Sequence, residues 1–200
     1  HEAFTTYMEA IYVEHLHGQE QMLAYLNTQR PMIGNKMAIQ GIKGVNFEEW
    51  PDADMYFKGS WMLHTLRNIV GDDDRWFEML KQMCEQYRHS IVDTKTITDF
   101  MAWKLGGDYQ VFFDEYLNHV GTPVLEYKFE RKKRRSILSY RWVANEASFN
   151  MPIDVSLFGE TVRLEPTTEW KTIIEKKLGE KNLVFDPNWG LYEVRNVSKP

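Results

Sequence analysis

Cysteine is almost absent from this chain of 200 residues, and its single representative, Cys84, cannot form an internal disulfide. No apolar run approaches the roughly 18 residues that span a bilayer, and no signal-peptide pattern opens the sequence. A glycine-rich phosphate loop, a cysteine-based metal cluster and a nucleophile elbow are also missing. By residue spacing alone, therefore, the chain contains no complete active site.

The overall composition is that of a globular protein, with 43% apolar and 26% charged residues. This length suits one large domain or two modest ones. Charge is unevenly spread, because residues 124–200 carry 14 Lys+Arg and 11 Asp+Glu, whereas the first 123 carry 10 and 18. The acidic first part disfavours nucleic acid as a ligand and mildly favours cationic groups such as amines.

Helical patterns dominate the first part of the chain. Apolar residues recur at helical spacing, and glycines follow several of these stretches as C-terminal caps. We expect Cys84, on one of them, to be a small core residue. The segment 32–51, with three glycines and weak periodicity, predicts a long loop that lines or covers a site. The expected helices cover residues 3–17, 19–29, 60–70, 74–87, 96–105 and 111–120.

Two local patterns set the ends of these helices. The third helix is expected to follow Gly59 and to bury one side, which carries Met62, Leu63 and Leu66. Thr96 and Asp99 resemble a capping box with Asp in place of the usual Glu, which predicts a helix that starts there.

After residue 122 the pattern changes from helical to strand-like. Short stretches rich in β-branched and aromatic residues alternate with Gly, Pro and Asn turns, as in a small β-sandwich. The sequence therefore predicts an α+β protein of two domains, a helical one at 1–122 and an antiparallel β-sandwich at 123–200. The expected strands cover residues 124–130, 137–143, 153–158, 161–164, 170–174, 183–185 and 192–197.

Isolated motifs predict little about chemistry. His1 and Glu2 begin like the zinc motif His-Glu-x-x-His, but Thr5 stands where the second histidine is needed. The basic run at residues 131–135 could bind nucleic acid, yet it lies between two expected strands, where an exposed hairpin carries the same charges to prevent edge pairing. Tyr56, just before Lys-Gly and a helix, could hold a phenol that donates a hydrogen bond to an oxyanion or could simply be a core-edge residue.

Four short patterns read together are more specific. Glu-Ala-Phe-Thr-Thr-Tyr-Met-Glu at residues 2–9 resembles the Glu-Gly-Phe-Ala-x-Tyr-x-Glu segment of the aminopeptidase N family of zinc metallopeptidases. Tyr-Phe-Lys-Gly at 56–59 resembles that family's Tyr-x-Lys-Gly motif, and Met-Leu-His-Thr-Leu-Arg at 62–67 is similar to the helix that follows it. Residues 112–117 and 121–125 resemble the exit from the family's helical subdomain into a β-sandwich. Order and spacing agree over roughly the first 125 residues.

This resemblance implies the C-terminal portion of a zinc aminopeptidase: the helical half of its thermolysin-like catalytic domain and the following sandwich. In that family two histidines of an upstream His-Glu-x-x-His helix and a downstream glutamate hold one zinc ion, and Glu2 matches the glutamate. Tyr56 matches the family's catalytic tyrosine, which donates to the oxyanion formed on the scissile carbonyl. The general base and the segment that anchors the substrate's free amino group are expected upstream.

The resemblance also implies partners, namely a peptide substrate and the missing upstream part of the same protein. The chain begins at His1 without an initiator methionine, so we expect the parent to extend further, and we expect the chain alone to be inactive. His1 stands where the family commonly has Asn, and Ala3 where it has Gly. An alternative is a non-catalytic scaffold that keeps the fold without the zinc motif. A weaker one is a non-peptide substrate, as in the related leukotriene hydrolases.

Overall fold

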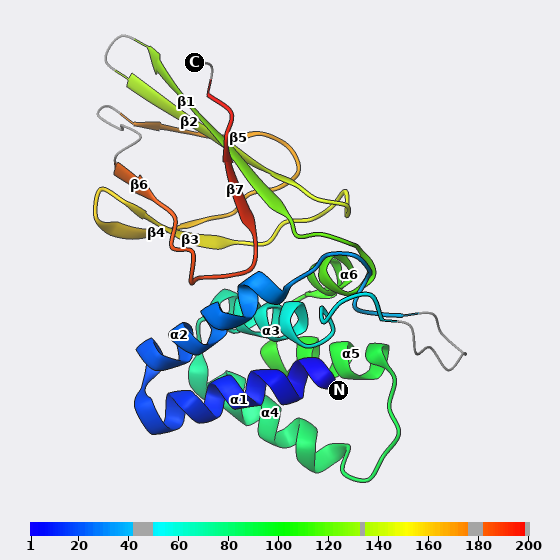
Figure 1. Ribbon diagram of the computed structural model, residues 1–200. Helices are drawn as coiled ribbons and strands as arrows, with labels where there is room; N and C mark the ends of the chain where they lie inside the picture. Colours follow the sequence, from blue (N-terminus) through cyan, green and yellow to red (C-terminus); the bar gives the residue numbers. More distant parts are fainter. Residues whose placement is uncertain (42–49, 133–134, 176–181, 199–200) are drawn as a thin grey trace.

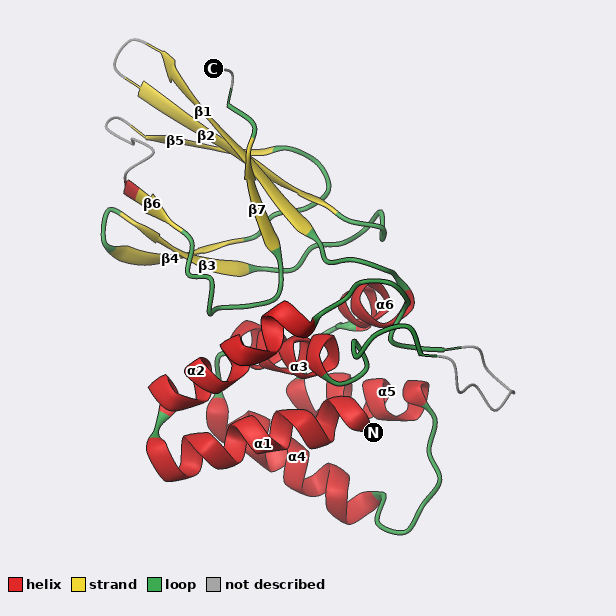
Figure 2. Cartoon of the chain, in the orientation of Figure 1, coloured by secondary structure: helices red, strands yellow, loops and turns green. Residues whose placement is uncertain are grey.

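A computed structural model gives the protein two stacked parts, a layer of helices and a β-sandwich above it (Figure 1). It describes residues 1–41, 50–132, 135–175 and 182–198. Helices account for the first part of the chain and strands for the second, as Figure 2 shows by colour. The predicted change from helix to strand lies between Asn118, where the last helix ends, and Val124, where the first strand begins.

Six α-helices and one 3₁₀ turn occur among the described residues. Most connections are short, but 24 residues, 33–56, separate the 3₁₀ turn from the third helix. The third helix, α3, occupies the centre of the layer, and 11 of its 14 residues are buried. The expectation of a single buried side was wrong, because neighbouring helices and the sandwich cover α3 all round. The helices are α1 (Glu2–His17), α2 (Gln19–Gln29), α3 (Phe57–Val70), α4 (Asp73–Gln86), α5 (Thr94–Leu105) and α6 (Gln110–Asn118), and the 3₁₀ turn η1 is Arg30–Met32.

The helix ends follow from local chemistry. Gly71 ends α3 in the left-handed region (φ 63°), where a side chain is costly. α5 begins two residues before the expected capping box, because the Asp93 carboxylate accepts the backbone N–H of Thr96. α3 likewise begins before Gly59, at Phe57, and α6 stops at Asn118 instead of 120.

The sandwich consists of a four-stranded sheet in the order β5-β2-β1-β7 and a three-stranded sheet in the order β4-β3-β6. β1 and β2 form the expected antiparallel hairpin, whose turn residues 133–134 lie outside the described part of the chain. Residues 42–49 of the long loop expected at 32–51 also lie outside it. The strands are β1 (Val124–Lys132), β2 (Arg135–Val143), β3 (Ile153–Leu157), β4 (Glu160–Leu164), β5 (Lys171–Glu175), β6 (Leu183–Val184) and β7 (Glu193–Asn196).

One pairing corrects the prediction of a wholly antiparallel sandwich. β7 runs parallel to β1, with Val124 beside Glu193. The segment before β7 crosses the helical layer, where the Tyr116 hydroxyl donates to the carbonyl of Leu191 (2.6 Å). Both strands therefore leave the helical layer in the same direction, and parallel pairing follows (Figure 1).

The segment 186–192 ties the sandwich to α3. The backbone N–H of Leu191 donates to the Thr65 hydroxyl (2.9 Å), and His64 Nε2 lies 2.9 Å from the carbonyl oxygen of Asn188. The amide nitrogen of Asn68 lies 3.1 Å from the same ring nitrogen. Burial lowers the pKa of His64 to about 4, so the ring is neutral near pH 7. Buried side chains of both layers form one continuous core; the division into two domains stays a prediction.

Two further expectations concern the position of Cys84 and the presence of a membrane-spanning segment. Cys84 is exposed, so its assignment to the core was wrong: it lies in the last turns of α4, which project beyond the packed centre of the layer. In the part of the chain that the structure describes, no helix is long and apolar enough to cross a membrane.

Candidate functional site

The N-terminal ends of α1 and α3 cross at a very close contact. A methyl group placed on Gly59 would lie 2.5 Å from the Cβ of Ala3 and 3.2 Å from its Cα, well inside the 3.5–4.0 Å or so at which carbon atoms pack. Glu2 directly precedes Ala3, and Tyr56 directly precedes α3. This contact therefore places the two predicted site residues at neighbouring helix ends.

Glu2 is in the first turn of α1, where the helix dipole favours a negative charge. Its side chain is partly buried and makes no hydrogen bond or ion pair with any described residue. Most partly buried carboxylates have partners of this kind. An unpaired one is free to bind a cation or a donor supplied from elsewhere.

Tyr56 caps the start of α3 and keeps its ring at the surface, 36% exposed. The ring rests against that of Phe57, with 6.3 Å between the two centroids. The hydroxyl makes no hydrogen bond within the described residues. The backbone, in contrast, is fixed: its N–H donates to the carbonyl of Ala53 (3.0 Å) and its carbonyl accepts from Ser60 (2.9 Å). A rigid backbone thus presents a free phenol.

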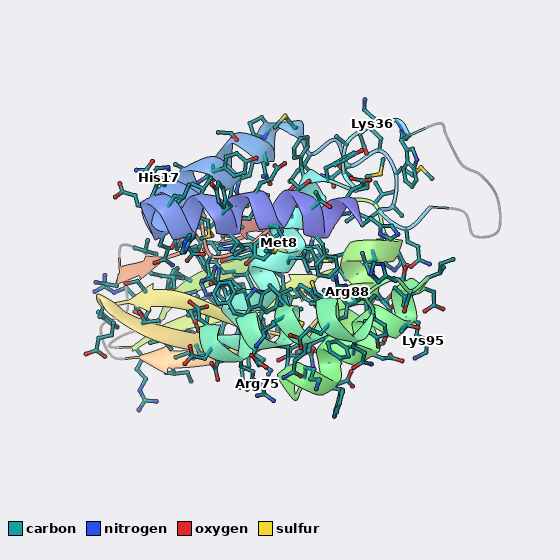
Figure 3. The ribbon with its side chains drawn as sticks, turned by 90° about the horizontal axis from the view of Figure 1, so that it is seen from below. Met8, His17, Lys36, Arg75, Arg88 and Lys95 are labelled. Atoms are coloured by element: carbon teal, nitrogen blue, oxygen red, sulfur yellow. The ribbon has the colours of Figure 1, made fainter. Side chains whose placement is uncertain are left out.

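A largely apolar cavity of about 740 Å³ adjoins these helix ends. Its wall includes Glu2 on α1 and Met55, whereas Tyr56, the next residue, does not line it. The far side is the connection between α4 and α5, which lies near Arg88 and Lys95 in Figure 3. The same view shows α1 along the outer surface of the helical layer, with Met8 at its middle. The cavity is large enough for a substrate or for part of another chain segment.

The described residues can supply one ligand to a zinc ion, the carboxylate of Glu2, but not a complete site. A carboxylate oxygen is an accepted zinc ligand, and that of Glu2 has no partner among the described residues. Within the described residues, however, no three His, Cys, Asp or Glu side chains lie close enough together to hold a metal ion. Any such site would need ligands beyond the described residues.

Two buried charged residues that flank Tyr56 were not singled out from the sequence. Lys58 is fully buried and its Nζ donates to the carbonyl of His119 at the end of α6 (2.9 Å). Burial lowers the pKa of Lys58, which nearby Asp54 and Glu115 oppose. Asp54 is 1% exposed and accepts two backbone N–H groups. The only feature of the sequence that could have drawn attention to Asp54 is the pattern Asp-Ala-Asp just before the Tyr-x-Lys-Gly motif. Its hydrogen-bond partners could not be predicted, because they lie in a loop about twenty residues earlier in the chain.

The Ala3–Gly59 contact leads to a stability prediction. Gly59→Ala is expected to destabilise the fold by about 1–3 kcal/mol through overpacking, although alanine favours a helix by about 1 kcal/mol. Adding Ala3→Gly should recover most of the loss, because the two methyl positions then exchange. Urea unfolding followed by circular dichroism measures both, with Ala3→Gly alone as the control. Equal stability of wild type and Gly59→Ala would show that the helices have room to separate.

Comparison with solved structures identifies a similar fold. A crystal structure of Legionella pneumophila aminopeptidase A in complex with aspartic acid matches with a TM-score of 0.62 and 15% sequence identity. The match covers 88% of this chain but only 21% of that protein, so this chain spans about a fifth of its length. At this identity the likeness concerns the fold alone, and it shows a peptidase-like arrangement of helices and a small β-domain.

Sequence comparisons do not assign the chain to a family. No family model matches the chain. No curated protein matches it either. The resemblance to the aminopeptidase N family therefore has support at the level of the fold, while membership of that family and the thermolysin-like class remain predictions.

Proposed function

We propose that this chain is part of a zinc-dependent aminopeptidase, in which it supplies one metal ligand and one oxyanion donor. The observation that carries the proposal is the Ala3–Gly59 contact, which holds Glu2 and Tyr56 on neighbouring helix ends. Neither the carboxylate nor the phenol has a partner among the described residues. The peptidase-like fold supports it. The upstream part of the parent is proposed to supply two histidines, the general base and the site for the substrate's amino group.

Glu2 is the proposed ligand from this chain. Its carboxylate adds an oxygen to two imidazole nitrogens, a ligand set typical of catalytic zinc that keeps one coordination position open. When bound, zinc makes water a potent nucleophile near neutral pH. The partly buried position at the cavity wall shields this carboxylate from bulk water, and shielding strengthens its attraction for a cation.

Tyr56 is the proposed hydrogen-bond donor to the scissile carbonyl. A phenol keeps its proton at neutral pH, since its reference pKa is about 10. As the carbonyl oxygen gains negative charge during attack by water, a donor already in place stabilises that charge without reorganisation. The fixed backbone of Tyr56 makes the residue suitable for this role. The substrate class is a peptide with a free N-terminus, in keeping with the acidic charge of residues 1–123.

The metal role gives a direct test. In the full-length parent, Glu2→Gln is expected to lower bound zinc from one ion per molecule to well below one after dialysis, because a neutral amide is a much weaker ligand. Elemental analysis measures this. Glu9→Gln is the matched control, since Glu9 is on the exposed face of the same helix, where it accepts a hydrogen bond from Tyr25 (2.6 Å). Its zinc content should stay at the wild-type level.

Two results would contradict the proposal. One is stoichiometric zinc in Glu2→Gln. The other is stoichiometric zinc, stable to dialysis, in this 200-residue chain alone, because a single carboxylate cannot hold the ion. If the parent lacks a His-Glu-x-x-His segment upstream of Glu2, the alternative of a non-catalytic scaffold replaces the enzyme.

A further inference from the structure

The loop at residues 34–36 is hydrogen-bonded to the turn that carries Tyr56, and we call this set of hydrogen bonds the clamp. Three consecutive backbone N–H groups, those of Gly34, Asn35 and Lys36, donate to two carboxylates. Gly34 and Asn35 bind the two oxygens of Asp54 at 2.7 and 2.9 Å, and Lys36 binds Asp52 at 2.7 Å. Consecutive N–H groups of this kind form a concave anion site. Here the protein's own carboxylates fill it.

Asp54 is the more buried of the two carboxylates, and we expect it to contribute more than Asp52 to holding the turn in place. It is 1% exposed, so burying it without hydrogen bonds would be very unfavourable. Burial raises its pKa, and the hydrogen bonds from Gly34 and Asn35 oppose that rise. Asn35 adopts a left-handed φ of 48°, and this angle helps to set the direction of the next N–H group, that of Lys36, which donates to Asp52. The loop is therefore shaped around both carboxylates.

The backbone of Asp54 extends the clamp to Tyr56. Its carbonyl accepts the N–H of Gly59 (3.0 Å), while the carbonyl of Ala53 accepts the N–H groups of Tyr56 and Phe57, both at 3.0 Å. Tyr56 thus lies inside a turn closed by hydrogen bonds at both ends. Because its hydroxyl has no partner among the described residues, the direction of the phenol depends on this backbone and on the ring contact with Phe57.

We propose that Asp54 is a positioning residue that holds Tyr56 in its working orientation by fastening its turn to the loop at 34–36. This inference rests on the proposed function of Tyr56. It assigns to Asp54 no contact with substrate or metal. Asp54 acts through the backbone, and a small rotation of the turn would move the phenol away from the oxyanion, where a misplacement of about 1 Å can cost about 10²-fold in rate.

The test is a double-mutant cycle in the full-length parent. Asp54→Asn keeps the shape but places an amide NH₂ opposite a backbone N–H, so one hydrogen bond is lost. We expect kcat to fall about 10–100-fold with KM within about 2-fold of wild type. Combined with Tyr56→Phe, it should lower kcat no further than Tyr56→Phe alone, since the group that it positions is already gone. Asp99→Asn, an exposed carboxylate paired with Lys95 on α5, is the control and should match wild type.

The outcomes separate the two proposals. If Tyr56→Phe itself retains wild-type turnover, the proposed function fails. If Tyr56→Phe is impaired but Asp54→Asn is not, or if the two losses multiply in the double variant, Asp54 does not act through Tyr56 and the positioning role is wrong. Should Asp54→Asn not fold, Asp52→Asn replaces it, because that carboxylate is less buried and supports the same clamp. Its smaller loss in kcat must likewise vanish in the Tyr56→Phe background.

Discussion

Tyr56→Phe in the full-length parent is expected to lower kcat by about 10²–10³-fold, the usual effect of removing one preorganised donor to an oxyanion. KM should change little, because the hydroxyl interacts with charge that develops only in the transition state. The change removes one oxygen and keeps the ring, so the contact with Phe57 and the fold are preserved. Hydrolysis of an aminoacyl-arylamide under saturating substrate measures kcat.

The control for Tyr56→Phe is a second exposed tyrosine. Tyr12 is 63% exposed on α1, ten residues along the helix from Glu2 and away from the Ala3–Gly59 contact. Tyr12→Phe should leave kcat unchanged. Turnover of Tyr56→Phe close to the wild-type value would contradict the proposed role of Tyr56 in stabilising the oxyanion. The Ala3–Gly59 contact would then have no link to catalysis through Tyr56.

Arg67→Met is expected to destabilise this chain by about 3 kcal/mol, the low end of the usual cost of breaking a buried ion pair. The Arg67 guanidinium links three helices: it binds Glu14 on α1 (2.6 and 3.0 Å) and Asp73 on α4 (2.7 and 2.8 Å). Burial alone would lower the pKa of Arg67, but the hydrogen bonds to both carboxylates outweigh it and raise the pKa. Methionine keeps most of the volume but leaves the Glu14 carboxylate, 19% exposed, without its partner.

Thermal unfolding of the purified chain measures the effect, and a loss of about 3 kcal/mol corresponds to a Tm lower by about 6–12 °C at this size. Lys95→Met is the matched control, because Lys95 pairs with Asp99 on the surface of α5, with 76% and 53% of the two side chains exposed. Such pairs contribute at most about 1 kcal/mol. Equal stability of the two variants would show that the Arg67 network does not hold the helices together.

The stability effects of changing Arg67 and its partner Glu14 are expected to be non-additive. Glu14→Gln added to Arg67→Met should recover part of the lost stability, because it removes the stranded charge. The Asp73 partner contributes less, since 61% of its side chain is exposed and water can replace the guanidinium. Asp73 has a pKa lowered chiefly by its hydrogen bond to Arg67, so this part of the stability is lost as pH falls through that lowered value.

Local patterns in the sequence were sufficient for the elements, and the family resemblance selected the candidate site residues. Hydrophobic spacing and helix-ending glycines predicted the helices, most of them within three residues of their observed bounds, and alternation predicted the strands. Both depend on interactions between residues close in the chain. The motifs at 2–9 and 56–59 also selected Glu2 and Tyr56, whose proximity in space then follows from the Ala3–Gly59 contact.

Tertiary structure alone decided the features that join distant segments. The parallel pairing of β7 with β1 depends on the path of residues 186–192 across α3, and no local pattern encodes that path. The burial of Lys58 on every side depends on the packing of α6 against α3. The clamp of Asp54 on residues 34–35 joins groups about twenty positions apart. In each case the partner is a backbone group, which every residue possesses, so side-chain identity cannot reveal which one is chosen.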